Sequence, residues 1–476
     1  MIKIEVLQPE EIEKIIENAY RVLEEIGVKV SCKEALKIYE EFGCTVEKRM
    51  VKIPREVVKK ALSTVPEYIT IYDRDGNPAM ELGGRNSYYG SGPTCTNFMD
   101  TKTGERRMST KQDAADTALV ADALENIDFV MSLVTEQDYT PKLADVHEVD
   151  AMLRNTTKPI ATWANNKENL EEVIDLFAAV KGGRDKLAEK PNVVIYSEPT
   201  TPLTHTRDAI EKVMVLAENR VPCLYTPGII MGGTGPVTMA ATLTIGIAEY
   251  FTGMVLHQAI APGAPFIGGV GASPMDMKTM TPPYGAPESY LVESASNEIF
   301  RYLHIPNFGL AGATDSVVLD SRAGWESAFS ILLSKGTGGN LIHDIGFMDY
   351  GLTGSIQHMV MCNEIIGMSN KILQGINMDE DSLAFDLIKE VGPGGQFISN
   401  RHTFKHFKKD IWQPKMFDRV DYDGWVRQGS RQMSQIVQEK TEEILANHVP
   451  TPLSDEVMAQ MDAIVAKAEE RIAAKG

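Results

Sequence analysis

Cysteine and positive charge are both scarce in this 476-residue chain. Its five cysteines are scattered and none forms a CxxC pair, so neither a disulfide framework nor a structural zinc site is expected. Lysine and arginine number 47 against 66 acidic residues, and the net charge of −19 argues against a nucleic-acid partner. Hydrophobic residues make up 43% and charged residues 24%, which is ordinary globular composition. We therefore expect a soluble cytoplasmic protein.

Features of exported or membrane-inserted chains are also sparse. The first residues, MIKIEVLQPEEIEKI, carry charge too early for a signal peptide. The most apolar run, Ala240–Ala261, is long enough for a membrane span, but it contains Glu249, His257 and many small residues. We predict that this run is a buried core helix and that the protein has no membrane partner.

Several common catalytic motifs are absent from the sequence. It contains no HExxH zinc motif, no P-loop lysine followed by serine or threonine, and no GxSxG nucleophile elbow. His402 and His406 lie at positions i and i+4 and could offer two ligands from one helix face. No third ligand is evident, so we expect no metal, and a metal-dependent lyase or aldolase is the weaker alternative.

Three glycines, Gly232, Gly233 and Gly235, precede a helical stretch in TPGIIMGGTGPVT. Their backbone N–H groups could face an anion, although the spacing is neither that of a P-loop nor GxGxxG. Close approach of the backbone to a bulky ligand or a facing chain is the preferred interpretation. These glycines are therefore the candidate cofactor-binding residues.

Helical stretches alternate with short apolar runs from about Thr110 onward. We predict strands in IDFVMSLV, PIATWANN, NVVIYSEP, PCLYTPGI, PFIGGVGA, NFGLAGAT and NLIHDIGF, and an eighth near GQFISN. Strands that alternate with helices in one long series are typical of parallel βαβ units. The pattern favours an α/β fold with a closed (β/α)8 TIM barrel, and an open doubly wound sheet is the alternative.

The other segments define the predicted domains. Residues 1–105 form an N-terminal extension of helices and a hairpin around Asp75-Gly76, which is expected to pack on the barrel. Residues 106–430 form the barrel, and residues 431–476 form a C-terminal helical segment. The long apolar helix and the C-terminal helix could each serve a subunit contact, so a homo-oligomer is expected.

Most of the predicted strands end in polar or aromatic residues. In a barrel, the C-terminal strand ends meet at one mouth, where such enzymes keep their active sites. Exposed loops are often polar for no functional reason, but the recurrence of such endings favours an active site. The endings are Glu136-Gln137-Asp138, Trp163-Ala164-Asn165, Ser197-Glu198, Tyr225-Thr226, Ser273, Thr314-Asp315 and His343-Asp344.

Aromatic residues gather near the same strand ends and loops. Such rings, with a few carboxylates, can hold a quaternary ammonium by cation–π attraction worth roughly 0.5–2 kcal/mol per ring. Filling of the core is the alternative use of these rings. The aromatic residues are Tyr88, Tyr89, Trp163, Tyr196, Tyr225, Tyr284, Phe347 and Tyr350.

The chain contains the long and unusual segments YGSGPT, SEPTTPLTH, TPGIIMGGTGPVT, GGNLIHDIGFMDYG and GPGGQFISNRHTFKHF. Together these segments resemble the trimethylamine methyltransferase family, and the likeness runs nearly end to end. The resemblance implies a barrel enzyme that passes a methyl group to the cobalt of a corrinoid (cobalamin) carried on a separate protein. It therefore implies a corrinoid protein as partner and no cofactor bound permanently to this chain.

One position departs from the family pattern. Leu341, in GGNLIHD, holds the place where the trimethylamine enzymes carry pyrrolysine. The departure makes the chain similar to the branch that acts on quaternary amines, glycine betaine first, then proline betaine, carnitine or γ-butyrobetaine. A quaternary ammonium is already cationic and departs as a neutral amine, so the special residue is not needed. A barrel that binds the amine or the corrinoid protein without turnover is the alternative.

The resemblance also implies roles for individual residues. His343 and Asp344, beside Leu341, are the catalytic candidates and are expected to line the mouth where the corrinoid approaches. Glu198 or Asp315 would offset the charge of the ammonium group. The predicted partners of a substrate carboxylate are His343, Arg401 and His402. The predicted aromatic cage consists of Tyr88, Tyr89, Tyr196, Tyr225 and Phe347.

Overall fold

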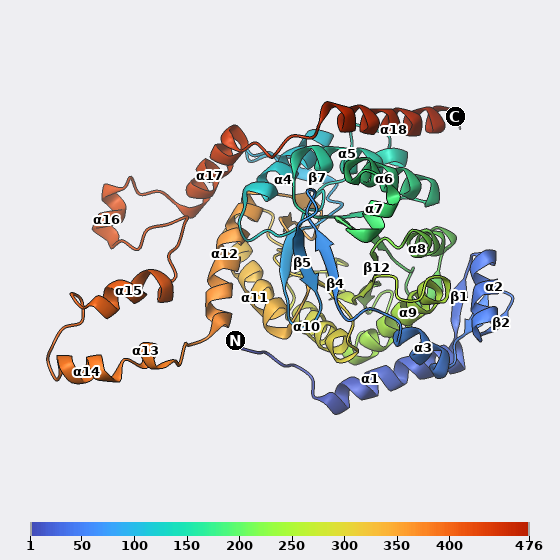
Figure 1. Cartoon of the computed structure of the whole chain (residues 1–476), viewed down its shortest axis with the longest axis horizontal. Helices are drawn as coiled ribbons and strands as arrows, with labels where there is room; N and C mark the ends of the chain where they lie inside the picture. Colours follow the sequence, from blue (N-terminus) through green and yellow to red (C-terminus); the bar gives the residue numbers. More distant parts are fainter. Residues whose placement is uncertain (1, 475–476) are drawn as a thin grey trace.

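Short parallel strands occupy the centre of the fold and helices surround them (Figure 1). The structure is a computed structural model that describes residues 2–474. It is a mixed α/β fold. The central strands are β6 (Tyr88–Ser91), β9 (Ile160–Trp163), β10 (Val193–Ser197), β12 (Cys223–Tyr225), β14 (Phe266–Gly268), β16 (Phe308–Leu310) and β17 (Leu341–Ile345).

Parallel pairing can be followed around this group of strands. One sheet has the order β14-β12-β10-β9 and another has the order β16-β17-β6. Single parallel bridges join them, one between Gly268 and Asn307 and two through the segment at Phe129 and Val130. These bridges pair Phe129 with Gly90 of β6 and Val130 with Ile160 of β9. The segments predicted as strands therefore lie side by side in chain order.

A long helix follows each central strand and covers its outer side (Figure 1). The apolar run predicted to be a core helix is α9, and most of α9 is buried against α1, α2, α3 and α8. Its Gly246 and Gly253 leave room for Val270 and the ring of Tyr225, which explains the small residues in that run. The helices are α4 (Lys111–Ala123), α5 (Ala144–Asn155), α6 (Lys167–Lys181), α8 (Arg207–Asn219), α9 (Met239–Ile260), α10 (Pro287–Tyr302), α11 (Ser321–Thr337) and α12 (Ile356–Gln374), with short η2 (Pro141–Leu143) and α7 (Arg184–Glu189) between them.

The N-terminal extension packs on one side of the helices and across one end of the strands. The predicted hairpin around Asp75-Gly76 is confirmed as β4 (Ile69–Tyr72) and β5 (Pro78–Leu82). Its apolar residues pack with buried side chains of the central strands, and this cluster fills the N-terminal end of the strand group. The other elements are α1 (Pro9–Arg21), η1 (Val22–Ile26), β1 (Val28–Val30), α2 (Lys33–Phe42), β2 (Thr45–Glu47), β3 (Met50–Lys52) and α3 (Arg55–Leu62), and β1 also pairs with β11 (Thr204–His205).

Two small sheets extend the strands at their C-terminal ends. Parallel β13 (Gly228–Met231) and β15 (Gly271–Pro274) continue from β12 and β14. The other sheet has the order β18-β19-β7-β8. Its strands are β18 (Phe347–Met348), β19 (Thr353–Gly354), β7 (Asn97–Met99) and β8 (Arg106–Met108).

Two predictions about organisation are wrong. GQFISN is not a strand: it lies in an irregular segment where Phe397 and Ile398 are 43% and 83% exposed, because the glycines around it favour turns. The missing strand is β6, so the central fold begins before the predicted boundary at residue 105. After α12 the chain leaves the body of the molecule, so residues 375–430, which were predicted as part of a barrel, do not belong to the central strands and their helices (Figure 1).

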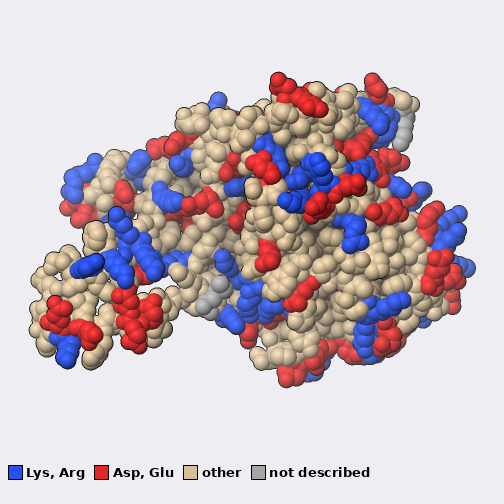
Figure 2. Space-filling model, viewed as in Figure 1, with Lys and Arg blue, Asp and Glu red and all other residues tan. Residues whose placement is uncertain are grey.

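The segment 375–430 is called the arm below. It carries α13 (Glu380–Leu383), α14 (Phe385–Val391), α15 (Arg401–Asp410) and α16 (Tyr422–Arg427). The chain then returns through α17 (Met433–Asn447), which packs on α4 and α12, and ends with α18 (Asp455–Ala474), which packs on α5 and α6. Figure 2 shows basic and acidic side chains interspersed over the face in view, in keeping with the excess of acidic over basic residues.

Leu341 occupies a different layer from the one expected. It is fully buried and packs in the apolar cluster beneath the hairpin, with Ile71, Leu82 and Phe308 among its members. The expectation that Leu341 belongs to the catalytic group is therefore corrected: two residues earlier than His343 on β17, it supports the site from below.

We expect Leu341→Ala to lower the free energy of unfolding by about 2–5 kcal/mol, because it leaves a cavity in a filled layer. Leu341→Met, which conserves volume, should cost less than about 1.5 kcal/mol. Urea denaturation followed by circular dichroism measures both variants. Equal stability of Leu341→Ala and the parent would show that this layer is loosely packed.

Candidate active site

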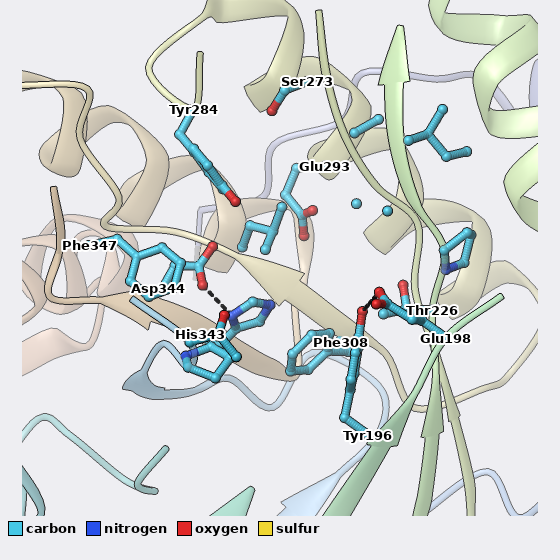
Figure 3. Close-up of a pocket in the computed structure, with 18 of the residues that line it drawn as sticks. Tyr196, Glu198, Thr226, Ser273, Tyr284, Glu293, Phe308, His343, Asp344 and Phe347 are labelled. Atoms are coloured by element: carbon cyan, nitrogen blue, oxygen red, sulfur yellow. Dashed lines mark hydrogen bonds and ion pairs between the residues drawn. The ribbon is translucent and has the colours of Figure 1, made fainter. Parts of the chain in front are cut away.

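A cavity of about 570 Å³ opens at the C-terminal ends of the central strands (Figure 3). Several of the predicted strand endings line it, which confirms that these ends converge on one site. The strand endings that line the cavity are Trp163, Glu198, Thr226, Ser273, His343 and Asp344.

A bulge in β17 brings His343 and Asp344 to the same cavity. Neighbouring strand residues normally point to opposite faces, but the pairing of β17 with β6 shifts register between Ile342 and Ile345. Asp344 has a left-handed φ of 78°, which is uncommon for a residue other than glycine. Nδ1 of His343 lies 2.5 Å from Oδ1 of Asp344, so the two side chains form one polar unit in the cavity wall.

Gly92, in the YGSGPT segment, permits this arrangement. A Cβ atom at this position would lie 2.8 Å from Oδ1 of Asp344 and closer still to the ring of Phe347. Any larger residue would displace both side chains from the cavity wall. The close packing of the β6 loop against β17 thus explains the glycine.

Aromatic rings form two groups in the cavity wall (Figure 3). The rings of Phe308 and His343 are stacked with centroids 3.9 Å apart, and Tyr196 lies 6.1 Å from Phe308. Tyr284 and Phe347 meet edge to face at 6.1 Å. Tyr196 and Phe347 are thus confirmed as lining residues, and the cavity offers ring surfaces from more than one direction.

Asp315 positions Tyr284 but does not line the cavity, contrary to the prediction that it faces a ligand. Its carboxylate accepts hydrogen bonds from the backbone N–H groups of Tyr284 and Gly285, at 2.8 and 2.9 Å. Arg322 lies 3.6 Å from the same carboxylate. The charge of Asp315 therefore has partners already, and its role is to hold the loop that carries Tyr284.

Three carboxyl groups and one lysine line the cavity: Glu198, Glu293, Asp344 and Lys212. Burial raises the pKa of Glu293 to about 8. Burial also lowers the pKa of Lys212, while the nearby Glu198 acts in the opposite direction. The hydroxyl of Tyr196 donates to Glu198, and burial raises the pKa of Tyr196 well above its usual value.

Two further acidic residues, Glu136 and Glu148, lie behind the cavity wall. Nε1 of Trp163 donates a hydrogen bond of 3.0 Å to Oε2 of Glu148. Burial raises the pKa of Glu148, and the neighbouring Glu136 raises it further. Burial also raises the pKa of Glu136 to about 8. Glu148, on α5, therefore supports Trp163 from behind, and the predicted strand ending at Glu136 is absent from the cavity lining.

Three members of the predicted aromatic cage lie elsewhere. Tyr88 packs beside the apolar cluster at the hairpin end. Tyr89 is buried and donates to the backbone oxygen of Ile331 in α11, 2.9 Å away. Tyr225 is buried against α9, with its hydroxyl 2.7 Å from Nδ1 of His205. All three belong to central strands, but Tyr88 lies at the opposite end of the strands from the cavity, and Tyr89 and Tyr225 point toward the surrounding helices.

Arg401 and His402, predicted as partners of a substrate carboxylate, lie away from the cavity. Both belong to α15 of the arm and neither lines the cavity. Nothing in the local sequence pattern reveals that the chain has left the central strands and their helices by this point.

Gly232, Gly233 and Gly235 lie on the turn between β13 and α9, near the cavity but outside its lining. Gly232 and Gly233 are exposed and Gly235 is half-buried. Gly232 has a φ of 85°, so the turn itself requires a glycine there. Their prediction as cofactor-binding residues stays untested.

Lys212, Glu293 and Phe308 were not predicted as site residues. Lys212 and Glu293 reach the cavity from helices α8 and α10, where no strand-end pattern could reveal them. One indirect sign exists: Gly309 in β16 lacks a side chain because Oε1 of Glu293 occupies that space. A glycine within a buried strand can thus mark a neighbouring side chain that passes over it.

Comparison with known proteins places the chain in a family. A family model described as trimethylamine methyltransferase (MTTB) matches residues 1–473. A glycine betaine methyltransferase from Desulfitobacterium hafniense is 32% identical over 467 residues, which cover 98% of this chain and 97% of the relative. A trimethylamine methyltransferase MttB from the same species is 32% identical over 463 residues, covering 97% and 93%. The MttB of Methanosarcina barkeri is 31% identical over 477 residues, covering 98% and 96%.

A solved structure shares the fold. The crystal structure of the Methanosarcina barkeri monomethylamine methyltransferase (MtmB) superposes with a TM-score of 0.52 at 11% identity, and it covers 94% of this chain and 89% of that one. The family match over nearly the whole chain confirms the resemblance of the sequence segments. The chain is a methyltransferase and belongs to the trimethylamine methyltransferase family.

Proposed function

We propose that this methyltransferase moves a methyl group from a quaternary amine, with glycine betaine as the first candidate, to Co(I) of a corrinoid on a separate protein. We also propose that the central strands form a closed (β/α)8 barrel, since parallel pairing can be followed around them and a helix follows each. The similarity to a glycine betaine methyltransferase along nearly the whole chain supports the substrate class.

The lining of the cavity carries this proposal. Tyr196, Phe308, Tyr284 and Phe347 supply ring surfaces, and Glu198, Glu293 and Asp344 supply carboxyl groups. Aromatic faces with nearby negative charge suit a cation that has no N–H to donate. The half-buried ammonium group of Lys212, which also donates to the backbone oxygen of Ala164, suits the carboxylate at the other end of a betaine.

Several lining residues have buried polar atoms without a hydrogen-bond partner among the described residues, including Oγ1 of Thr226 and Oδ2 of Asp344. Oε1 of Glu293 and Nε2 of His343 are buried and make no hydrogen bond. Such groups are rare in folded proteins and commonly face a ligand or water. Both point toward the space between the two aromatic groups (Figure 3).

The proposed chemistry asks little of the side chains. Reduced corrinoid cobalt supplies the nucleophile, and a quaternary nitrogen leaves as a neutral amine, so the residues need only bind, orient and exclude water. The lining fits this requirement, because it contains no cysteine, and its Ser273 hydroxyl contacts Ser289 at 3.2 Å rather than a base. Leu341, at the place of pyrrolysine in relatives, lies below the cavity in an apolar layer.

The proposal predicts methyl transfer from glycine betaine. The purified protein, a Co(I) corrinoid protein and glycine betaine should give the absorbance of methyl-Co(III) and an equal amount of dimethylglycine. Proline betaine, carnitine, γ-butyrobetaine and trimethylamine, assayed alongside, identify the preferred donor. Turnover of trimethylamine alone would overturn the proposal, and binding of betaine without any methyl transfer would favour a binding protein.

Betaine affinity is expected to rise with pH up to about 8 and then level off. Glu293 is largely protonated below its pKa of about 8, and a bound cation favours its carboxylate, so binding releases a proton in that range. Each pH unit below 8 should weaken binding by up to about tenfold. Calorimetric titration in buffers of different ionisation enthalpy measures both the affinity and the proton released.

Glu293→Gln should remove most of that pH dependence, whereas Glu288→Gln should keep it. Glu288 is exposed in the first turn of the same helix and does not line the cavity. A pH profile that survives in Glu293→Gln would assign the titration to another group.

Lys212→Met should lower kcat/KM for glycine betaine by about 10–100-fold, because a charge-assisted hydrogen bond to its carboxylate is lost. Binding of tetramethylammonium, which has no carboxylate, should change little. Lys335→Met, at a lysine that bonds to Asn370 outside the cavity, is the matched control. Equal losses for both ligands would mean that Lys212 acts on the cavity's shape and not on the carboxylate.

A further inference from the structure

The arm has little core of its own. Helices α13, α14 and α15 contain no buried residue, and apolar side chains such as Phe385 and Phe404 are 71% and 75% exposed. A segment that buries so little apolar surface needs another source of order, and disulfides or metal ions are the usual ones. The chain's cysteines, all buried, lie outside the arm.

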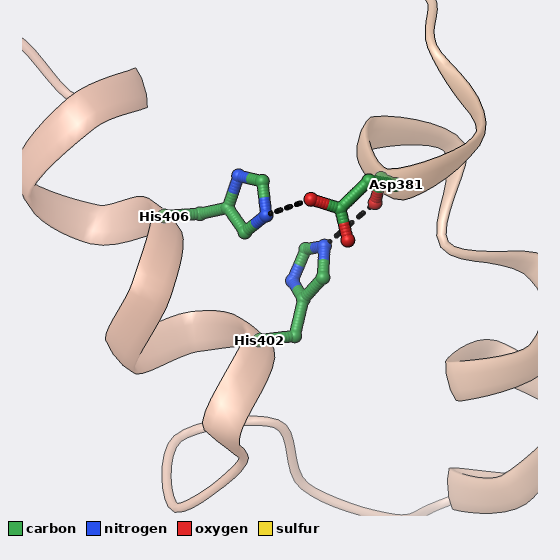
Figure 4. A group of neighbouring side chains, drawn as sticks. All are labelled: Asp381, His402 and His406. Carbon is green, nitrogen blue, oxygen red and sulfur yellow. Dashed lines mark hydrogen bonds and ion pairs between the residues drawn. The ribbon is translucent and has the colours of Figure 1, made fainter.

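Three potential metal ligands converge within this segment (Figure 4). His402 and His406 lie one turn apart on α15, and their rings are stacked with centroids 4.1 Å apart. Asp381, from α13, faces both of them, and one ligand atom from each of the three residues lies within 4.8 Å of the others. Two helices that share no apolar core are thus brought together by ligand-type side chains.

The spacing suits a small tetrahedral ion. Nε2 of His406 lies 3.1 Å from Oδ2 of Asp381, and the ligand atoms of all three residues lie within 4.8 Å of one another. Bonds of about 2.0–2.1 Å at tetrahedral angles place neighbouring ligand atoms about 3.3 Å apart. Small shifts of these side chains would therefore admit an ion.

The surroundings resemble a supporting shell around metal ligands. Nδ1 of His406 pairs with the carboxylate of Asp410, which leaves Nε2 to face Asp381. Metal-bound histidines commonly make such a contact with a carboxylate through their other ring nitrogen. The side chain of Asn400 accepts from the backbone N–H of His402 at 2.8 Å and so begins α15 just before the first ligand.

We propose that Asp381, His402 and His406 bind a divalent transition-metal ion of the zinc class, which fastens α13 to α15 and orders the arm. Two imidazoles and one carboxylate favour such an ion over magnesium or calcium, which prefer oxygen ligands. Water can complete a four-coordinate shell. Lys405, which pairs with Asp381 in the structure, would be displaced toward solvent. The site is structural, since none of its three ligands lines the cavity.

Metal content of the full-length chain, purified without a polyhistidine tag, tests the proposal. After incubation with Zn²⁺ and dialysis, about one ion per chain should remain. With Co²⁺, the intense visible absorption of a tetrahedral site should appear. Retention of less than about a tenth of an ion per chain would overturn the proposal.

Variants then locate the ion. His406→Ala and Asp381→Asn should each lose it, whereas His304→Ala should keep it, because His304 is an exposed histidine that pairs with Glu67 elsewhere. Circular dichroism checks that each variant is folded. If both ligand variants keep the ion as well as the parent does, the site is wrong.

Limited proteolysis tests the role in order. Chelation by EDTA should make cleavage within residues 375–430 about tenfold faster in the parent and leave it unchanged in His406→Ala. Cleavage that is insensitive to EDTA in the parent would contradict a role in ordering the arm. None of these readouts depends on methyl transfer, so they are independent of the proposed function.

Discussion

The bulge at the end of β17 is the constraint on which the site depends. A regular strand would turn either His343 or Asp344 out of the cavity, whereas the register shift and the left-handed backbone of Asp344 keep both there. Such a conformation costs about 1–3 kcal/mol and persists only where packing holds it in place. The packing comes from Gly92 and Phe347, so the YGSGPT loop, β17 and the start of β18 act as one unit.

The charges around the cavity follow from what burial does to each group. Glu293 has the room left by Gly309 but no partner for Oε1, so its neutral form is favoured until a cation arrives. Asp315 accepts two backbone hydrogen bonds and holds Tyr284 in place, so its carboxylate is already stabilised within the protein. Some acids near the site therefore hold the surrounding loops, as Asp315 does, and others remain free to contact a ligand, as Glu293 does. The sequence alone does not tell the two kinds apart.

Much of the fold could be predicted from the sequence because buried parallel strands and amphipathic helices leave strong local patterns. The sequence does not reveal β6, because YYGS is short and contains glycine. GQFISN looks like a strand because it contains two neighbouring apolar residues. The rule that the C-terminal ends of the strands carry the active site correctly predicted that His343, Asp344, Trp163 and Glu198 line the cavity.

The same rule has a limit set by geometry. It could not find Lys212 or Glu293, which reach inward from helices. It also placed Tyr225 in the cavity, because the side to which a strand residue points depends on register. Asp381, the third ligand of the proposed metal site, was not predicted because it lies 21 residues before His402, in another helix.

The two ends of the strand group differ, and the difference bears on the proposed reaction. The hairpin of β4 and β5 fills the N-terminal end with apolar side chains that pack on Leu341, whereas the cavity lies at the C-terminal end. A methyl donor and a corrinoid protein would therefore approach from the same side. Under that proposal the donor would occupy the cavity while the much larger protein covers it, so the amine would bind first and its product would leave last. This order of binding would follow because the hairpin closes the N-terminal end of the strand group and leaves access only from the C-terminal end.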